Sequence, residues 1–199
     1  MVLPEINFKI SYYLHSEILS SSYNFNRLFR FVNSFEKFFK KRKKEVLKSI
    51  EKLTGFGWKQ KNIDVWFFDS WHPSVSYPLL LNVYGFDKDF VFFNLVHELV
   101  HNNLFDLVIY KSKKDKKKYD MIELEAFVNL ITKYVLLKFF NEKKVNELCK
   151  KAEFGGVYKY VWKRAKELEN KINFEKTNLK KWIQRYGERW KYTIKTNFP

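Results

Sequence analysis

The stretch NLVHELVHN, residues 94–102, decides how the rest of this chain is interpreted. His97 and His101 are four residues apart, so on a helix they lie on one face, one turn apart, and both imidazoles can reach the same ion. The residues around them, from Phe90 to Phe105, are otherwise almost all apolar, which predicts a buried helix with a single polar stripe. Such a stripe is costly in a core unless it is paired or binds a metal. The segment therefore predicts a helix that carries a metal site.

Zinc is the ion that fits this pattern best. It binds histidine nitrogen readily and tolerates a site with an open fourth position. Glu98 projects beside the two histidines, where it can take a proton from a metal-bound water and pass it to a leaving amine. The ion lowers the pKa of that water from about 16 to about 7. The pattern favours a hydrolytic zinc site with Glu98 as its catalytic residue, over a hydrogen-bonded pair of core histidines beside a surface glutamate.

A catalytic zinc site needs a third protein ligand, and the next predicted helix offers two carboxylates. Glu123 and Glu125 are two residues apart, so they face different sides of that helix and at most one can point at the metal. Glu125 is in line with Asn129 in a second polar stripe, which favours Glu125 as the ligand. Glu123 is the runner-up, although a solvated position near the helix start is the favoured interpretation for it. Asn129 is expected to hydrogen-bond one of the ligands.

Other ligand candidates fit less well. Cys149 is alone and far downstream, while His15 and His72 lie upstream of the motif. For His72, in a Trp-His-Pro loop, a structural role is favoured.

Apolar periodicity predicts an α+β fold that is mostly helical, with a small sheet of about three strands. The basic run at residues 40–44 is expected to be the solvated face of one long helix. In the C-terminal third, aromatic residues at helical spacing are expected to be core rather than platforms for stacking bases. We expect a catalytic core at 1–141 and a helical extension at 142–199, packed as a single compact domain. The expected elements are a strand at 6–12, a helix at 24–53, strands at 63–68 and 79–84, a helix from Asp87 or Asp89 to about 110, a charged loop at 111–118, a helix at about 120–140, and further helices to the C-terminus.

The two histidines with Glu98, followed by Glu125-Ala126-Phe127-Val128-Asn129, resemble the gluzincin group of zinc metallopeptidases. The compact size is similar to that of minigluzincins and of ImmA/IrrE-like peptidases. The resemblance implies a zincin-like fold, in which a backing helix and a small sheet precede the active-site helix and an edge strand lies above the cleft. Residues 24–53 would be the backing helix.

The implied edge strand also suggests how a peptide substrate would bind. Its backbone would add to the strand at 79–84, with Asn82 helping to position it. This strand consists of Leu79, Leu80, Leu81, Asn82, Val83 and Tyr84. The donor that stabilises the oxyanion stays open among His72, Tyr77, Tyr119, Tyr134 and Tyr158.

Composition limits the classes of protein that fit. The 199 residues suffice for one domain with a core, and no uncharged apolar run approaches the length of a membrane span. A single cysteine and no recognisable signal peptide make the cytoplasm the expected location. The net charge of +16 has two interpretations, a lysine-rich composition or binding to a polyanion. A basic nucleic-acid-binding protein with a structural or degenerate metal site is therefore the alternative function, and a SprT-like DNA-associated protease would combine the two.

Overall fold

The computed structural model is a mixed α/β protein that is mostly helical. It describes residues 2–11, 25–69, 74–85, 87–105, 107–109, 116–152, 158–190 and 192–194, and these contain seven helices, a three-stranded parallel sheet and a two-stranded antiparallel sheet. The chain divides into two compact units. The first comprises residues 1–48 and 58–102, and the second comprises 49–57 and 103–199. No helix among the described residues has the length and apolar character needed to cross a membrane.

A parallel sheet organises the first unit. Its strands β1 (Glu5–Ile10), β2 (Asn62–Phe68) and β3 (Leu79–Asn82) are arranged in that order, with Phe8 opposite Val65. Side chains of β1 alternate between exposed and partly buried, as its alternating sequence predicts. The expected small sheet is confirmed. The expected third strand ends at Asn82, two residues early, and residue 12 of the first strand lies outside the described residues.

The expected single helix at 24–53 is in fact two helices, α2 (Phe25–Lys40) and α3 (Lys43–Thr54). The chain turns at Lys41 and Arg42, where the Arg42 amide donates to Phe39 O at 2.7 Å. The guanidinium of Arg42 lies 3.9 Å from the centre of the Phe38 ring and donates to Phe38 O. The basic run therefore sits at a helix junction, because consecutive cations repel and Arg42 finds its partners only where the helix breaks.

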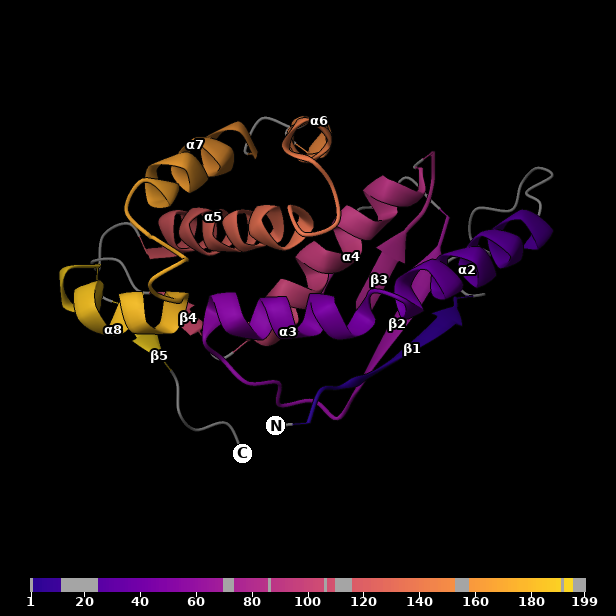
Figure 1. Ribbon diagram of the computed structural model, residues 1–199, viewed down its shortest axis with the longest axis horizontal. Coiled ribbons are helices and arrows are strands. Elements are labelled where there is room, and N and C mark those ends of the chain that lie inside the picture. Colours follow the sequence, from indigo (N-terminus) through magenta and orange to yellow (C-terminus); the bar gives the residue numbers. More distant parts are fainter. Residues whose placement is uncertain are drawn as a thin grey trace. The chain divides into compact units, whose positions relative to one another are not determined.

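Helix α2 lies beside the sheet (Figure 1), and aromatic side chains make the contact between them. Phe35 and Phe39 contact Phe8 of β1, and Phe67 of β2 lies edge-on to Phe8. Phe92, from α4 (Lys88–Asn103), lies edge-on to Phe39 and so joins the same core. This core fixes the helix that carries the histidine motif against the sheet.

Helix α4 begins where the sequence predicts and ends earlier. The Asp87 carboxylate accepts a hydrogen bond from the Phe90 amide at 2.8 Å, which is an N-cap interaction. The helix stops at Asn103 instead of continuing to about residue 110. The following residues form β4 (Leu107–Ile109), which pairs in antiparallel fashion with β5 (Tyr192–Ile194) in the second unit.

The second unit is mainly helical. Helix α5 (Lys116–Leu136) packs against α6 (Glu142–Ala152) and α7 (Tyr158–Glu169), and Phe127 of α5 meets Trp182 of α8 (Leu179–Trp190) edge-on. Helix α5 therefore belongs to the same unit as α6, α7 and α8. Helix α5 also begins at Lys116, so residues 116–118 are helical and not part of the expected loop. Tyr186, which the sequence placed in these stripes, is exposed, and the side chains of Tyr158 and Trp190 lie outside the described residues. The other members of the C-terminal stripes are core as predicted: Val161, Trp162, Ala165, Leu168, Ile172, Leu179, Trp182 and Ile183.

Candidate metal centre

The two histidines of the motif lie together on α4 in the first unit. The Nε2 atoms of His97 and His101 are 3.1 Å apart, and the ring centres are 4.8 Å apart. His97 also stacks on Phe93, one turn earlier, with an angle of 17° between the rings. Both rings are partly exposed, whereas Val96 and Val100 of the same helix are fully buried. The spacing of four residues thus places both imidazoles on one face of α4, as helix geometry predicts.

Glu98 lies on the buried side of the same helix turn. It is 7% exposed, and its Oε2 accepts a hydrogen bond of 2.6 Å from Ser76 Oγ. The alternative interpretation, a pair of core histidines beside a surface glutamate, does not describe this arrangement, because here the glutamate is buried and the histidines are partly exposed. A buried carboxylate needs a hydrogen-bond donor, and Ser76 supplies one.

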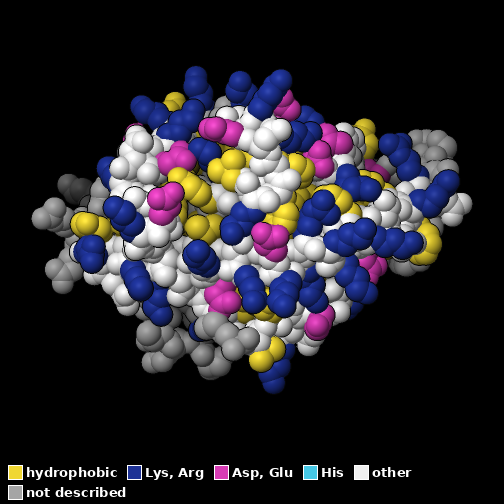
Figure 2. Space-filling model, in the orientation of Figure 1, with side chains coloured by type: hydrophobic (Ala, Val, Ile, Leu, Met, Phe, Trp, Pro, Cys, Tyr) yellow, Lys and Arg dark blue, Asp and Glu magenta, His cyan; other side chains and the backbone are white. Residues whose placement is uncertain are grey.

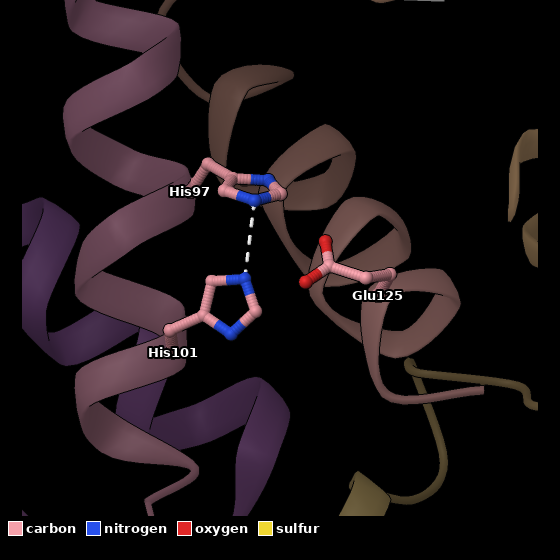
Figure 3. Close-up of side chains that lie close together, drawn as sticks. All are labelled: His97, His101 and Glu125. Carbon is pink, nitrogen blue, oxygen red and sulfur yellow. Dashed lines mark hydrogen bonds between the residues drawn. The ribbon is translucent and has the colours of Figure 1, made fainter. Parts of the chain in front are cut away.

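Glu125 comes from α5 in the second unit and is partly exposed. One ligand atom from each of His97, His101 and Glu125 lies within 4.8 Å of the other two. Figure 3 shows the Glu125 carboxylate directed toward the two imidazole rings. Within the described residues, this is the group of three that could hold a metal ion.

The chemistry of this donor set suits zinc. Two imidazole nitrogens and one carboxylate oxygen are the ligands of many catalytic zinc sites, with a fourth position left open. Two nitrogen ligands in a tetrahedral zinc site are about 3.3 Å apart, given bonds of about 2.0–2.1 Å. The His97 and His101 nitrogens, at 3.1 Å, are already close to that separation. The residues present therefore fit the ion that the motif implies.

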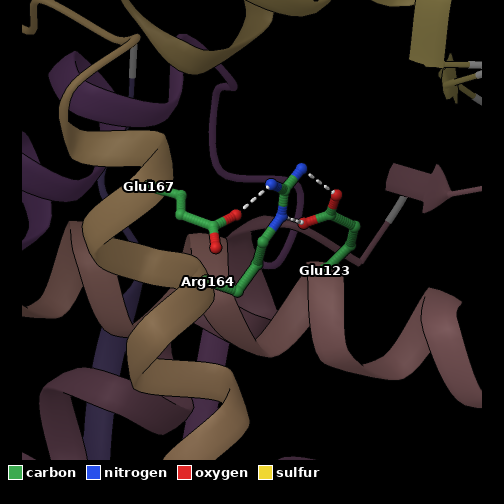
Figure 4. A network of polar contacts seen from close by, with 3 residues as sticks. All are labelled: Glu123, Arg164 and Glu167. Atoms are coloured by element: carbon green, nitrogen blue, oxygen red, sulfur yellow. Dashed lines mark hydrogen bonds and ion pairs between the residues drawn. The ribbon is translucent and has the colours of Figure 1, made fainter.

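Glu123 is engaged elsewhere, and the expectation that it would be solvated is wrong. It is 1% exposed, and its two oxygens accept hydrogen bonds from Arg164 at 2.7 and 2.6 Å (Figure 4). Arg164 also donates to Glu167 at 2.6 Å. The hydrogen bonds to Glu123 are the main cause that raises the pKa of Arg164, and the bond from Arg164 lowers the pKa of Glu167. Arg164 was missed in the sequence, and the only signal was that Glu123 aligns with core residues.

Asn129 does not make the contact expected of it. It is 2% exposed on α5, and its Nδ2 has no hydrogen-bond partner among the residues that the structure describes. The same holds for Thr132 Oγ1, three residues further along. The second polar stripe of α5 is thus a buried one, in which Glu125 is the partly exposed member.

The strand expected to bind a peptide is already paired on its outer side. Leu80 exchanges two backbone hydrogen bonds with Val75, at 3.0 and 2.9 Å, and the Asn82 amide donates to Ser74 Oγ. Asn82 Oδ1 accepts from the Tyr84 amide, so this side chain serves a local turn. The edge predicted at 79–84 is therefore covered by the chain's own residues 74 and 75, because a short turn brings them back along β3.

The candidates for an oxyanion donor separate into two groups. The Tyr77 hydroxyl donates to Asn102 O at 3.2 Å, and Tyr134 packs on Phe174, where burial raises the tyrosine pKa. The side chains of His72, Tyr119 and Tyr158 lie outside the described part of the chain, as does His15. Cys149 is buried in α6.

Comparison with protein-family models, with curated proteins and with solved structures finds no match for this chain.

Proposed function

We propose that this chain is a zinc-dependent metallopeptidase. The observation that carries the proposal is the convergence of His97, His101 and Glu125, whose ligand atoms lie within 4.8 Å of one another. These three residues would hold one Zn²⁺. When bound, the ion would lower the pKa of a bound water to about 7 and so supply hydroxide at neutral pH.

Glu98 would act as the general base and acid. It follows His97 directly and is buried, so its carboxylate is shielded from bulk water and keeps a defined orientation. Its role would be to accept a proton from the attacking water and deliver it to the leaving amine of a peptide. The chain order of one strand, two helices, two strands and the motif helix supports the resemblance to a zincin-like fold of the gluzincin type, although the expected backing helix is divided in two. A cytoplasmic location remains the expectation from a single cysteine, which is buried.

The direct test is elemental analysis of the purified full chain combined with a cleavage assay on a quenched-fluorescent peptide library. We expect one zinc per chain, and cleavage that is lost in Glu98→Gln while the zinc remains. Glu167→Gln is the matched control, because Glu167 is an exposed carboxylate that lies outside the proposed centre. Absence of stoichiometric zinc, or full cleavage by Glu98→Gln, would overturn the proposal.

Binding to nucleic acid is the second candidate, and the net charge of +16 favours it. Figure 2 shows Lys and Arg side chains spread over the whole visible face with acidic side chains between them. Such dispersed charge is typical of a lysine-rich composition as well as of weak, sequence-independent binding. If binding to duplex DNA exists, its affinity should fall steeply between 50 and 200 mM salt, on the order of 10³-fold or more for six or more phosphate contacts. Cleavage together with such binding would favour the SprT-like combination.

A further inference from the structure

We propose that Ser76 is a positioning residue for Glu98. It would hold one carboxylate oxygen so that the other is presented for proton transfer. This inference rests on the proposed function, in which Glu98 is the general base.

The contact itself is short and partly buried. Ser76 Oγ donates to Glu98 Oε2 at 2.6 Å, and the glutamate is 7% exposed. A hydroxyl that donates to a carboxylate at this distance makes a charge-assisted hydrogen bond, which is stronger than a neutral one. Within the described ranges, Ser76 is the one residue that hydrogen-bonds this carboxylate. The bond to Oε2 therefore leaves Oε1 as the oxygen available for chemistry.

The serine is fixed from the side of the sheet. Val75, the preceding residue, exchanges two backbone hydrogen bonds with Leu80 of β3. Ser74, one residue earlier, accepts a hydrogen bond from the Asn82 amide. The backbone that carries Ser76 thus extends the sheet, and the sheet sets its position.

The serine is also fixed from the side of α4. Asn102 Nδ2 donates to Ser76 O at 3.2 Å and to Glu98 O at 3.0 Å, so one amide group joins both partners. The next residue, Tyr77, donates through its hydroxyl to Asn102 O. Asn102, which joins these bonds, is 6% exposed, so the centre of the network is buried. Ser76 is therefore held between the sheet and the motif helix.

Such placement matters because a general base acts only in a narrow range of positions. A glutamate has three rotatable side-chain bonds, and a displacement of about 1 Å at a catalytic group can cost on the order of 100-fold in rate. A hydroxyl that fixes one oxygen removes most of that freedom before the substrate arrives. Its loss should reduce kcat and leave zinc affinity unchanged, since the Ser76 hydroxyl donates to Glu98 and Glu98 is not one of the proposed zinc ligands.

The first experiment compares serine variants of the zinc-loaded full chain on the quenched-fluorescent peptide library. We expect Ser76→Ala to lower kcat by about ten- to hundredfold, with KM and zinc content unchanged. Ser76→Thr keeps the hydroxyl and should restore most of the rate. Ser34→Ala is the matched control, because Ser34 Oγ accepts a bond from Lys88 of the same helix at 2.7 Å without touching Glu98. Equal kcat in Ser76→Ala and the wild type, or a fall that Ser76→Thr does not reverse, would overturn the proposal.

The second experiment needs no catalysis. It measures the thermal midpoint of the metal-free full chain for Ser76→Ala, Glu98→Ala and the double variant. If the two side chains are bonded, the double variant should lower the midpoint by clearly less than the two single shifts added together. Additive shifts would refute the contact itself. Non-additive shifts in a chain whose wild type binds no zinc and cleaves nothing would overturn the proposed function and with it the catalytic role of Ser76, while the contact would stand.

Discussion

Two polar clusters in apolar surroundings differ in the kind of group that completes them. On α5, the buried Glu123 is neutralised by Arg164 of α7, through two hydrogen bonds. At the candidate metal centre, His97, His101 and Glu125 bring together atoms that can each offer a lone pair to a cation. The first cluster contains its own cation, whereas the second is a group of atoms that could hold one. Burial of a glutamate in this chain therefore does not by itself point to a metal, since the more deeply buried Glu123 is paired with an arginine.

Replacing each glutamate in turn tests most strongly whether the two clusters have different roles. We expect Glu125→Gln to weaken zinc binding on the order of 100-fold, because the amide carries no charge to offer the ion. We expect Glu123→Gln to bind zinc as the wild type does but to unfold more easily, because Arg164 loses the buried one of its two charged partners. Elemental analysis and urea unfolding of both variants measure the two effects. The assignment of roles would be reversed if Glu123→Gln lost the zinc and Glu125→Gln kept it.

Arg164→Met should cause the largest loss of stability. It removes the guanidinium that donates two hydrogen bonds to the Glu123 carboxylate, whose side chain is 1% exposed. Removing one partner of a buried ion pair costs about 3–5 kcal/mol of unfolding free energy. Urea unfolding measures this loss, and zinc content should stay at the wild-type level. A variant as stable as the wild type would mean that Glu123 is hydrated or protonated at little cost.

The spacing of residues in the sequence correctly predicted features formed within a few residues of one another. It did not predict contacts between residues far apart in the sequence. The separation of His97 and His101 by four residues fixes their common face, and Asp87 caps α4 as its side chain predicts. The partners of Glu123 and Glu98, which are Arg164 and Ser76, lie 41 and 22 residues away in sequence. Helical periodicity carries no information about them, because tertiary packing alone brings them together.

Local periodicity also failed where a specific interaction ends an element. The apolar pattern runs on through residues 24–53, but the helix breaks at Lys41 and Arg42 because Arg42 caps the Phe38 carbonyl and covers its ring. The pattern around residues 79–84 correctly predicted a strand. It did not reveal that the turn after Val75 folds back to cover the edge.

Adding and removing zinc should also distinguish the two clusters, with a smaller effect on stability than the substitutions above. A ligand at 100 times its dissociation constant stabilises the folded state by about 2.7 kcal/mol. We therefore expect added zinc to raise the thermal midpoint of the wild type, and a chelator to reverse the rise. Arg164→Met should show the same rise from its lower starting point, whereas His101→Ala should show none. A rise in His101→Ala equal to that of the wild type would indicate that the zinc binds at another place.

The smallest expected effect is the loss of stability at acidic pH that Glu167, the exposed partner of Arg164, contributes. Arg164 holds the pKa of Glu167 below its ordinary value of 4.5, chiefly by a hydrogen bond. A carboxyl whose pKa is depressed in the folded state contributes stability above its unfolded pKa, and that contribution is lost as the pH falls through the folded value. The wild type should therefore lose a small stabilisation below about pH 4.5, and Glu167→Gln should lack that part of the pH dependence.

Because Glu167 is exposed to solvent, the effect should also shrink in high salt, unlike the loss in Arg164→Met. Thermal midpoints of both chains between pH 3 and 7, at low and high salt, measure it. Parallel curves for the two chains would mean that Arg164 is satisfied by Glu123 alone and that Glu167 adds nothing to the cluster.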